Sequence, residues 1–139
     1  MNFSKSKYCG YWQCPKMCWL KEYKSNEFEA DPSVDARFVA GNKVGDLARG
    51  LFGKSIDVTA HKADKSLDLQ LMIAKTRELM AEGAENICEA SFSFNGLYCA
   101  VDILHKQNGG YAIYEVKSST KNKYIYSVDV AYQKYVLEK

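Results

Sequence analysis

The pair Asn95-Gly96 constrains the fold of this chain more than any other feature of the sequence. It separates two runs of alternating polarity, ICEASFSF and LYCAVDIL, and Asn-Gly between such runs favours a two-residue type I′ hairpin turn. In that hairpin Phe94 pairs with Leu97, and counting inward places Glu89 opposite Asp102. Like charges directly opposite each other in a sheet are destabilising, so this pair requires a nearby cation or a raised pKa.

A third alternating run, YAIYEVK, follows the connection HKQNGG. A four-residue loop over residues 107–110 would place Glu115 opposite Asp102, on the side of Asp102 away from Glu89. A six-residue loop would keep Glu115 on the same face of the sheet but make its contact with Asp102 diagonal. Glu115 and Lys117 share a face because successive side chains of a strand point to opposite faces. We therefore expect a three-stranded antiparallel meander over residues 87–117, one face of which gathers three carboxylates and an amine.

This acidic cluster allows two interpretations. An isolated E-x-K pair is usually a solvent-exposed ion pair that contributes little to stability. The position of Asp102 between apolar residues, and the register that brings Glu89 to it, favour a functional site instead. The placement of Glu89 depends on a regular ladder, because a single bulge would turn it to the other face.

Helical periodicity accounts for most of the remaining chain. We expect one domain, because 139 residues suffice for a modest core, and 47% hydrophobic with 26% charged residues is ordinary for a globular protein. The expected parts of this single domain (1–139) are an N-terminal helical segment rich in Cys, aromatic and Lys residues (1–34), helices (35–83), the meander (87–117) and a Gln-containing helix (127–139).

Caps and breakers set the expected ends of these helices. The first helix begins at Ser4 or Ser6, and Pro15 breaks it or starts a second one. Residues 25–35 form a loop, residues 35–51 form a helix closed by Gly53, and a longer helix runs from a Ser66 cap to Glu82 before Gly83.

Composition excludes some classes of protein and supports others only weakly. No apolar run is long enough to span a membrane, and no cleavable leader pattern is present. Five irregularly spaced cysteines do not form a disulfide framework, so we expect a cytoplasmic protein with reduced thiols. A net charge of +2 is too small to identify a nucleic-acid binder by itself. His61 and His105 lack ligand-like spacing and are expected at the surface.

Clustered carboxylates bind hard divalent cations such as Mg²⁺ through oxygen. Phosphodiester hydrolysis uses such an ion, which polarises the phosphoryl group and activates a water, while a nearby lysine orients that water or stabilises charge. Asp102, Glu115 and Lys117 fit these roles.

Several segments resemble one family of nucleases. VDIL followed by EVKSS looks like the D…E-x-K core of the PD-(D/E)xK nuclease superfamily. DVAYQKYVL resembles the Gln-containing helix of its RecB-like exonuclease branch, and QCPKMCWL resembles the Cys-Pro segment of that branch and of related CRISPR-associated nucleases. GNKVGDLARGLF resembles the glycine-led motif that precedes the core. Together these segments cover most of the chain.

The resemblance implies a restriction-endonuclease-like α/β core, in which helices flank a mixed central sheet that contains the antiparallel meander. It implies that Asp102 and Glu115 bind a metal ion, which we expect to be Mg²⁺ or Mn²⁺. Our own hypothesis adds Glu89 and the Val116 carbonyl as further ligands. It makes Lys117 the catalytic lysine.

The resemblance also assigns roles outside the meander. Gln133 would position the substrate or the site, although a glutamine on an amphipathic helix more often faces solvent. The expected nucleic-acid-binding residues are Lys121, Lys123, Tyr132 and Tyr135. In relatives the Cys-Pro cysteine is one ligand of an iron-sulfur cluster, which makes Cys14 the candidate here. Its downstream partners are absent, so we expect no iron-sulfur cluster in this chain alone.

The sequence departs from the family in three places. Gly45 stands where many members have a metal-binding histidine four residues after the leading glycine, Gly41. Leu137 stands where a tyrosine often follows the glutamine. The last predicted helix reaches Lys139, so we expect a C-terminally truncated core whose open side is covered by a further domain or a protein partner.

The N-terminal segment combines lysines with aromatic residues, as single-strand binding proteins do. The aromatic residues are Tyr8, Tyr11, Trp12 and Trp19. Packing of these rings onto the sheet is the interpretation we favour over binding.

These observations predict a metal-dependent DNA nuclease, an exonuclease of the RecB-like type that acts in repair or defence. Its expected partner is DNA, and we expect no association with a membrane. The alternative is a catalytically inactive DNA-binding or assembly module that keeps the nuclease fold. A structural domain with an accidental acidic cluster is the third interpretation.

Overall fold

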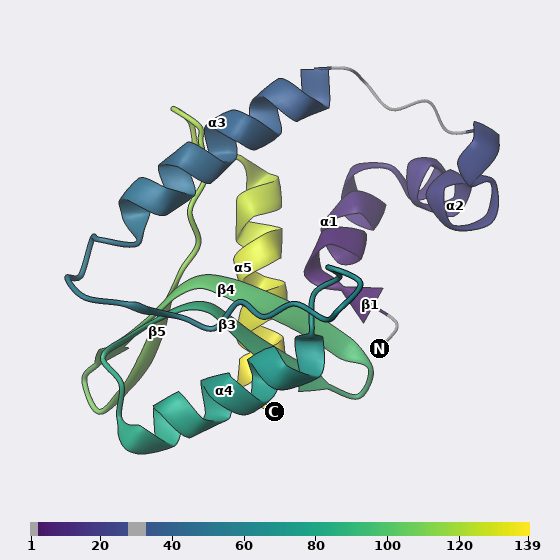
Figure 1. Ribbon diagram of the computed structural model, residues 1–139. Coiled ribbons are helices and arrows are strands. Elements are labelled where there is room, and N and C mark those ends of the chain that lie inside the picture. Colours follow the sequence, from purple (N-terminus) through teal and green to yellow (C-terminus); the bar gives the residue numbers. More distant parts are fainter. Residues whose placement is uncertain (1–2, 28–32) are drawn as a thin grey trace.

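The computed structural model describes residues 3–27 and 33–139 as helices arranged around one mixed sheet (Figure 1). The described strands are β1 (Phe3–Ser4), β2 (Ile56–Asp57), β3 (Asn86–Phe94), β4 (Leu97–Gln107) and β5 (Gly110–Tyr114). They are ordered β1-β4-β3-β2, and β5 also pairs with β4. β1 runs parallel to β4 and β2 parallel to β3, whereas β3, β4 and β5 form an antiparallel meander. The expected α/β class and the mixed sheet are confirmed.

Two Asn-Gly turns join the strands of the meander. Asn95 and Gly96 have φ angles of 46° and 81°, and Asn108 and Gly109 have φ angles of 51° and 77°. A type I′ turn requires such left-handed conformations at both central residues. The second turn is therefore tighter than the predicted loop over residues 107–110.

The predicted register of the meander is confirmed, with one interruption. β3 and β4 keep the same register on both sides of Glu89 and Asp102. These two residues do not form a ladder pair, because Glu89 has a left-handed backbone with φ of 56°. β5 also has the predicted register: its last pair joins Tyr114 to Ile103, which brings Glu115 level with Asp102.

The described helices are α1 (Lys5–Gln13), α2 (Pro15–Tyr23), α3 (Ser33–Ala48), α4 (Leu69–Glu82) and α5 (Tyr124–Leu137), with a 3₁₀ turn, η1, at Ser25–Glu27. The Ser4 hydroxyl caps α1 as predicted, by accepting a hydrogen bond from the Lys7 N–H at 3.3 Å. Pro15 starts α2, in agreement with one of the two predicted alternatives.

Some predicted helix boundaries are wrong. α4 begins after Asp68 rather than Ser66, because the N–H and hydroxyl of Ser66 are bonded to Asp64 in a local turn. α5 begins at Tyr124, earlier than predicted, and α3 begins at Ser33, inside the predicted loop. Residues 28–32 of that loop lie outside the described part of the chain.

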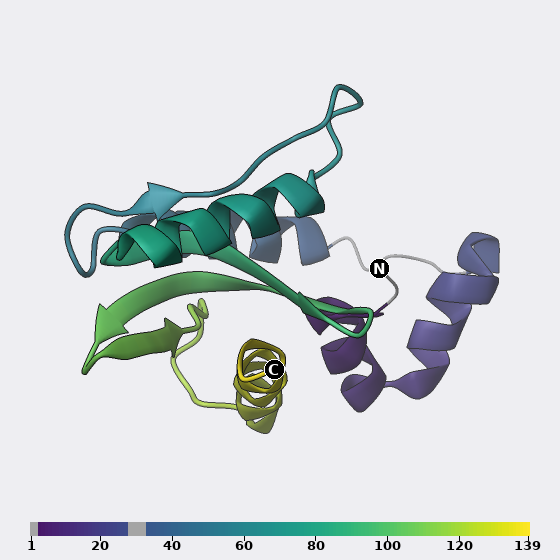
Figure 2. The same cartoon turned by 90° about the horizontal axis from the view of Figure 1, so that it is seen from below.

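Helices cover both faces of the sheet, with α4 on one side and α5 on the other (Figure 2). The core between α4 and the sheet is built from apolar side chains: Val58, Ala60, Met72, Ile87, Ala90, Val101 and Leu104. The core beneath α5 is smaller and contains Cys99, Tyr132 and Val136. Among the described residues, the helices are all too short or too polar to cross a membrane.

Candidate functional site

An incompletely covered edge of β4 determines where the site lies. β1 pairs with only the first two residues of β4, and β5 pairs from Ile103 onward, so no described strand covers this edge at residues 99–102. Lys5 directly follows β1 and Glu115 directly follows β5, and their side chains meet across the gap. A cavity of about 900 Å³, which we call the β4 cavity, opens here and is also lined by α3 and α5.

The β4 cavity brings together the residues predicted for the metal site. Asp102, Glu115, Lys117, Glu89 and Val116 all line it. The Val116 N–H donates a hydrogen bond to Asp102 Oδ2 at 2.7 Å, which fixes the Asp102 carboxylate against the end of β5. The residues that the sequence predicts to converge therefore line one cavity.

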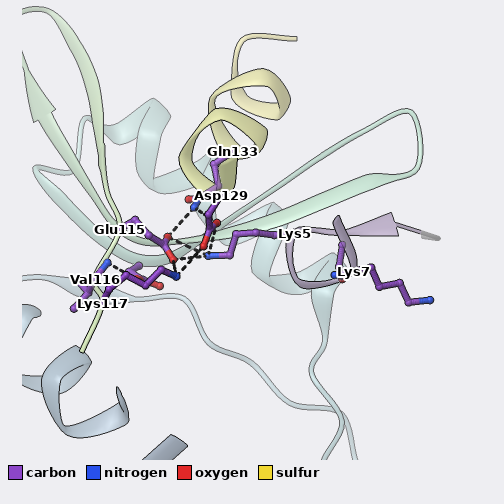
Figure 3. Close-up of polar contacts among 9 residues, drawn as sticks. Lys5, Lys7, Glu115, Val116, Lys117, Asp129 and Gln133 are labelled. Carbon is purple, nitrogen blue, oxygen red and sulfur yellow. Dashed lines mark hydrogen bonds and ion pairs between the residues drawn. The ribbon is translucent and has the colours of Figure 1, made fainter. Parts of the chain in front are cut away.

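Glu115 lies at the centre of a network of charged side chains (Figure 3). Lys5 Nζ is 3.1 Å from both of its carboxylate oxygens. Lys117 Nζ donates to Oε1 at 2.5 Å, and Gln133 Nε2 donates to Oε2 at 2.7 Å. With only 4% of its side chain exposed, Glu115 is held toward α1 and α5.

Asp129, from α5, is a second acid of this network that the sequence reasoning missed. It accepts hydrogen bonds from Lys117 at 2.7 Å and from Gln133 at 2.9 Å, and its Oδ1 lies 3.7 Å from Lys5 Nζ. The spacing of four residues between Asp129 and Gln133 could have identified it, because residues i and i+4 share a helix face. Lys5 carried no comparable local signal, since it lies 110 positions from Glu115.

Gln133 is completely buried, contrary to the usual solvent-facing position of a glutamine on a helix. It does not line the β4 cavity but contacts Glu115 and Asp129 from behind. Both of its N–H donors bind carboxylates, while its Oε1 has no hydrogen-bond partner among the described residues. The geometry therefore makes it a positioning residue for the two acids.

The network shifts the pKa values of its members in different directions. Burial raises the pKa of Glu115 and the charge of Asp102 adds to this effect, although Lys5 and Lys117 oppose it. Burial alone would raise the pKa of Asp129, but hydrogen bonding to Lys117 and the charge of Lys5 bring it below its ordinary value. Burial alone would lower the pKa of Lys117, but its bonds to Asp129 and Glu115 raise it well above its ordinary value. Lys117 is therefore an ammonium at neutral pH.

Within the lining of the β4 cavity, Glu89 is paired with Arg49, which follows α3. Arg49 Nη2 lies 3.6 Å from Glu89 Oε1, and Arg49 Nη1 donates a hydrogen bond to Asp57 in β2. Burial raises the pKa of Glu89, and the Asp102 charge raises it further against the opposing effect of Arg49. The predicted approach of Glu89 to Asp102 is therefore present as an electrostatic interaction rather than as a ladder pair.

The donor chemistry of the β4 cavity fits a hard divalent cation. Its described lining contains five carboxylates against three basic side chains, an excess of negative charge. Carboxylate oxygens are the preferred ligands of Mg²⁺ and Mn²⁺. The described residues, however, contain no group of three or more His, Cys, Asp or Glu side chains arranged to hold an ion. The Glu115 carboxylate is instead bonded to Lys5, Lys117 and Gln133.

The remaining predicted residues are spread around the site. Lys121 lines a smaller cavity of about 330 Å³ that shares Glu115 and Lys117 with the β4 cavity. Lys123 is exposed at the start of α5 and Tyr135 is half exposed on it. Tyr132, predicted to contact nucleic acid, is only 6% exposed, and its hydroxyl donates to the Phe3 carbonyl.

Cys14, the candidate iron-sulfur ligand, is exposed at the start of α2. Its sulfur accepts a hydrogen bond from the Met17 N–H at 3.4 Å and thereby caps this helix. This contact gives Cys14 a structural role in the described part of the chain.

Comparisons with protein families, with curated proteins and with solved structures found no match to this chain.

Proposed function

We propose that this chain is a metal-dependent DNA nuclease that hydrolyses phosphodiester bonds in the β4 cavity. The observation that carries the proposal is the convergence of Asp102, Glu115 and Lys117 on one negatively charged cavity. A phosphodiester is itself an anion, so it can approach these carboxylates closely only when a cation lies between them. The resemblance to the RecB-like branch of the PD-(D/E)xK superfamily supports the same assignment, with a restriction-endonuclease-like core.

Mg²⁺ or Mn²⁺, when bound, would supply Lewis-acid activation of a water and of the phosphoryl group. Asp102, whose Oδ2 accepts a hydrogen bond from the Val116 N–H, would be one of the residues that hold the ion. Glu89 and Glu115 provide the other carboxylates, and the Val116 carbonyl is a further candidate. Glu115 must exchange its contact with Lys5 to take part.

Lys117 acts as a cation rather than as a base. Its raised pKa keeps the amine protonated, and two of the three N–H groups bind Glu115 and Asp129. The third remains for a water or a phosphoryl oxygen, where it stabilises developing negative charge. Asp129 and Gln133 position this lysine and Glu115.

Titration with Mn²⁺ tests the proposal directly. We expect calorimetry to detect binding to the wild-type chain and to Glu78→Ala, which removes an exposed acid from α4, and to detect none with Asp102→Ala. On DNA with Mn²⁺, Lys117→Ala should retain metal binding but lose cleavage by about 100-fold or more, as removal of a charge-stabilising donor does in other hydrolases. Binding that is absent from the wild type or unchanged in Asp102→Ala would contradict the proposal.

A catalytically inactive DNA-binding or assembly module is the second candidate. It is favoured by the engagement of Glu115 with Lys5, Lys117 and Gln133 and by the incomplete metal-ligand set of the described residues. Such a protein would bind DNA without cleaving it in either Mg²⁺ or Mn²⁺. The cleavage assay on the wild-type chain separates the two candidates.

A further inference from the structure

A second groove, of about 890 Å³, lies between α1 and α2. We call it the α1–α2 groove. Four of its lining residues are aromatic, namely Phe3, Tyr11, Trp19 and Tyr23. α1 packs beside α5, and α2 lies beyond α1, away from the sheet (Figure 1).

The aromatic rings of this segment do not all pack onto the sheet, contrary to the interpretation favoured from the sequence. Tyr8 packs against the core cluster between α5 and the sheet, with its ring centroid 4.9 Å from that of Tyr132 in α5. Tyr11, Trp19 and Tyr23 are 55%, 52% and 70% exposed. The ring centroids of Trp19 and Tyr23 are 5.8 Å apart, so together they form an extended aromatic surface.

The charge of the α1–α2 groove is opposite to that of the β4 cavity. Its lining contains Lys7, Lys16 and Lys21 against one acid, Glu22. Lys7 Nζ bonds Glu22 at 2.7 Å, which connects α1 to α2 beside the groove. Lysines interleaved with exposed aromatic rings suit an anionic chain of flat bases.

The two cavities share the α1 helix as a wall. Lys5, Ser6 and Cys9 line the β4 cavity, and Ser6 and Gly10 line the α1–α2 groove. Ser6 thus lies on both, so the two cavities adjoin at the first turn of α1.

We infer that the α1–α2 groove binds single-stranded DNA and leads it to the β4 cavity. Unpaired bases stack on Trp19, Tyr23 and Tyr11, and the lysines face the phosphates. A duplex keeps its bases stacked on one another and cannot use these ring faces, so the groove selects the single-stranded form. The inference rests on the proposed nuclease function and specifies the form of its substrate.

Trp12 provides a matched control for Trp19. Both rings are 52% exposed, but Trp12 does not line the groove and instead contacts Tyr8 and Tyr124. The experiment measures the fluorescence anisotropy of a labelled thymidine oligonucleotide with the full chain in EDTA, where metal-dependent cleavage does not occur. Trp19→Ala, Trp12→Ala and Tyr23→Ala are compared with the wild type, and circular dichroism checks that each variant is folded.

We expect Trp19→Ala and Tyr23→Ala each to raise the Kd about 5-fold or more, and Trp12→Ala to leave it within about 2-fold, because stacking on an aromatic ring is lost only in the first two. Lys16→Ala should make the dependence of log Kd on log salt shallower by about 0.7, the value for one phosphate contact to a single strand. A duplex of the same length should bind more weakly.

Three results would overturn the inference: no oligonucleotide binding by the wild type, equal effects of the two tryptophan variants, or a duplex bound as tightly as the single strand. A change in oligomeric state in Trp19→Ala with unchanged oligonucleotide affinity would also overturn it and would assign the groove to a second copy of the chain. Each of these results leaves the Mn²⁺ titration unaffected, so failure of this inference and failure of the proposed nuclease function are distinguishable.

Discussion

Replacement of Gln133 by leucine tests whether this buried amide holds the two acids of the site. The variant removes two hydrogen bonds to carboxylates, each worth about 1.5–3 kcal/mol for a charged acceptor. It also removes the buried Oε1, which has no hydrogen-bond partner among the described residues, and it buries additional apolar surface. Together these two changes offset about 1–3 kcal/mol of the free energy lost with the hydrogen bonds. We expect a net loss of about 2 kcal/mol in the free energy of unfolding near pH 8.

The pH dependence of that loss follows from the pKa of Glu115. Because its folded pKa is raised above the ordinary value of 4.5, its contribution to stability is fully present below pH 4.5 and is lost as the pH rises through the folded pKa. The contribution of Asp129 to stability has the opposite pH dependence. Because its folded pKa is lowered, this contribution is present above pH 3.8 and is lost as the pH falls through the folded pKa. At about pH 4 Glu115 is mostly neutral and needs the amide donor less, so Gln133→Leu should cost less there than at pH 8.

Urea denaturation followed by circular dichroism at both pH values measures this effect. With a slope of about 2 kcal/mol per molar urea, the expected loss lowers the midpoint by about 1 M at pH 8. Gln70→Leu, which alters an exposed glutamine in α4, should change the stability by less than about 0.5 kcal/mol. An unchanged or increased stability of Gln133→Leu, or an equal cost at both pH values, would refute the role assigned to the amide.

Substitutions at two glycines give further predictions, a gain in metal affinity at Gly45 and a loss of stability at Gly96. Gly45 lines the β4 cavity, and a Cβ at this position would meet open space. Gly45→His should therefore add a metal ligand and lower the Kd for Mn²⁺, measured by calorimetry, by about 10-fold. Gly45→Ala, the control, should leave this Kd unchanged. Equal affinities of Gly45→His and Gly45→Ala would contradict this expectation. Gly96→Ala should lower the free energy of unfolding by about 1 kcal/mol, because φ at Gly96 is 81°. Thermal unfolding of this variant beside Gly41→Ala, in a helix with open space, is the measurement, and equal stability of the two would contradict it.

The meander was predictable because its information is local. Asn95-Gly96 fixes one turn, strand alternation fixes the faces, and the register then follows by counting, which is how Glu115 came level with Asp102. The left-handed conformation of Glu89 was not predictable in this way, because nothing in the alternation of ICEASFSF marks the interruption.

The network behind Glu115 could not be derived by the same means. Lys5 reaches it because β1 joins β4 in parallel, a pairing of two residues with no alternating pattern to reveal it. Asp129 was predictable in part, since it lies on the same helix face as Gln133. The sequence does not show that this face is buried beside the apolar residues Val128 and Tyr132, because its burial depends on how α5 packs. Tertiary contacts, rather than local propensity, decide these positions.

The charge distribution explains why Asp102 is the most informative residue to remove. Glu115 and Asp129 are balanced by Lys5 and Lys117, so loss of any of these four leaves a net charge in a largely buried network. A variant of that set, Lys117→Ala included, also changes stability, so circular dichroism must show that it is folded before its activity is compared. Asp102 stands outside it: among the described residues it forms no ion pair, and its carboxylate is bonded to a backbone N–H. Its replacement therefore removes a prospective metal ligand while the four-charge network stays balanced.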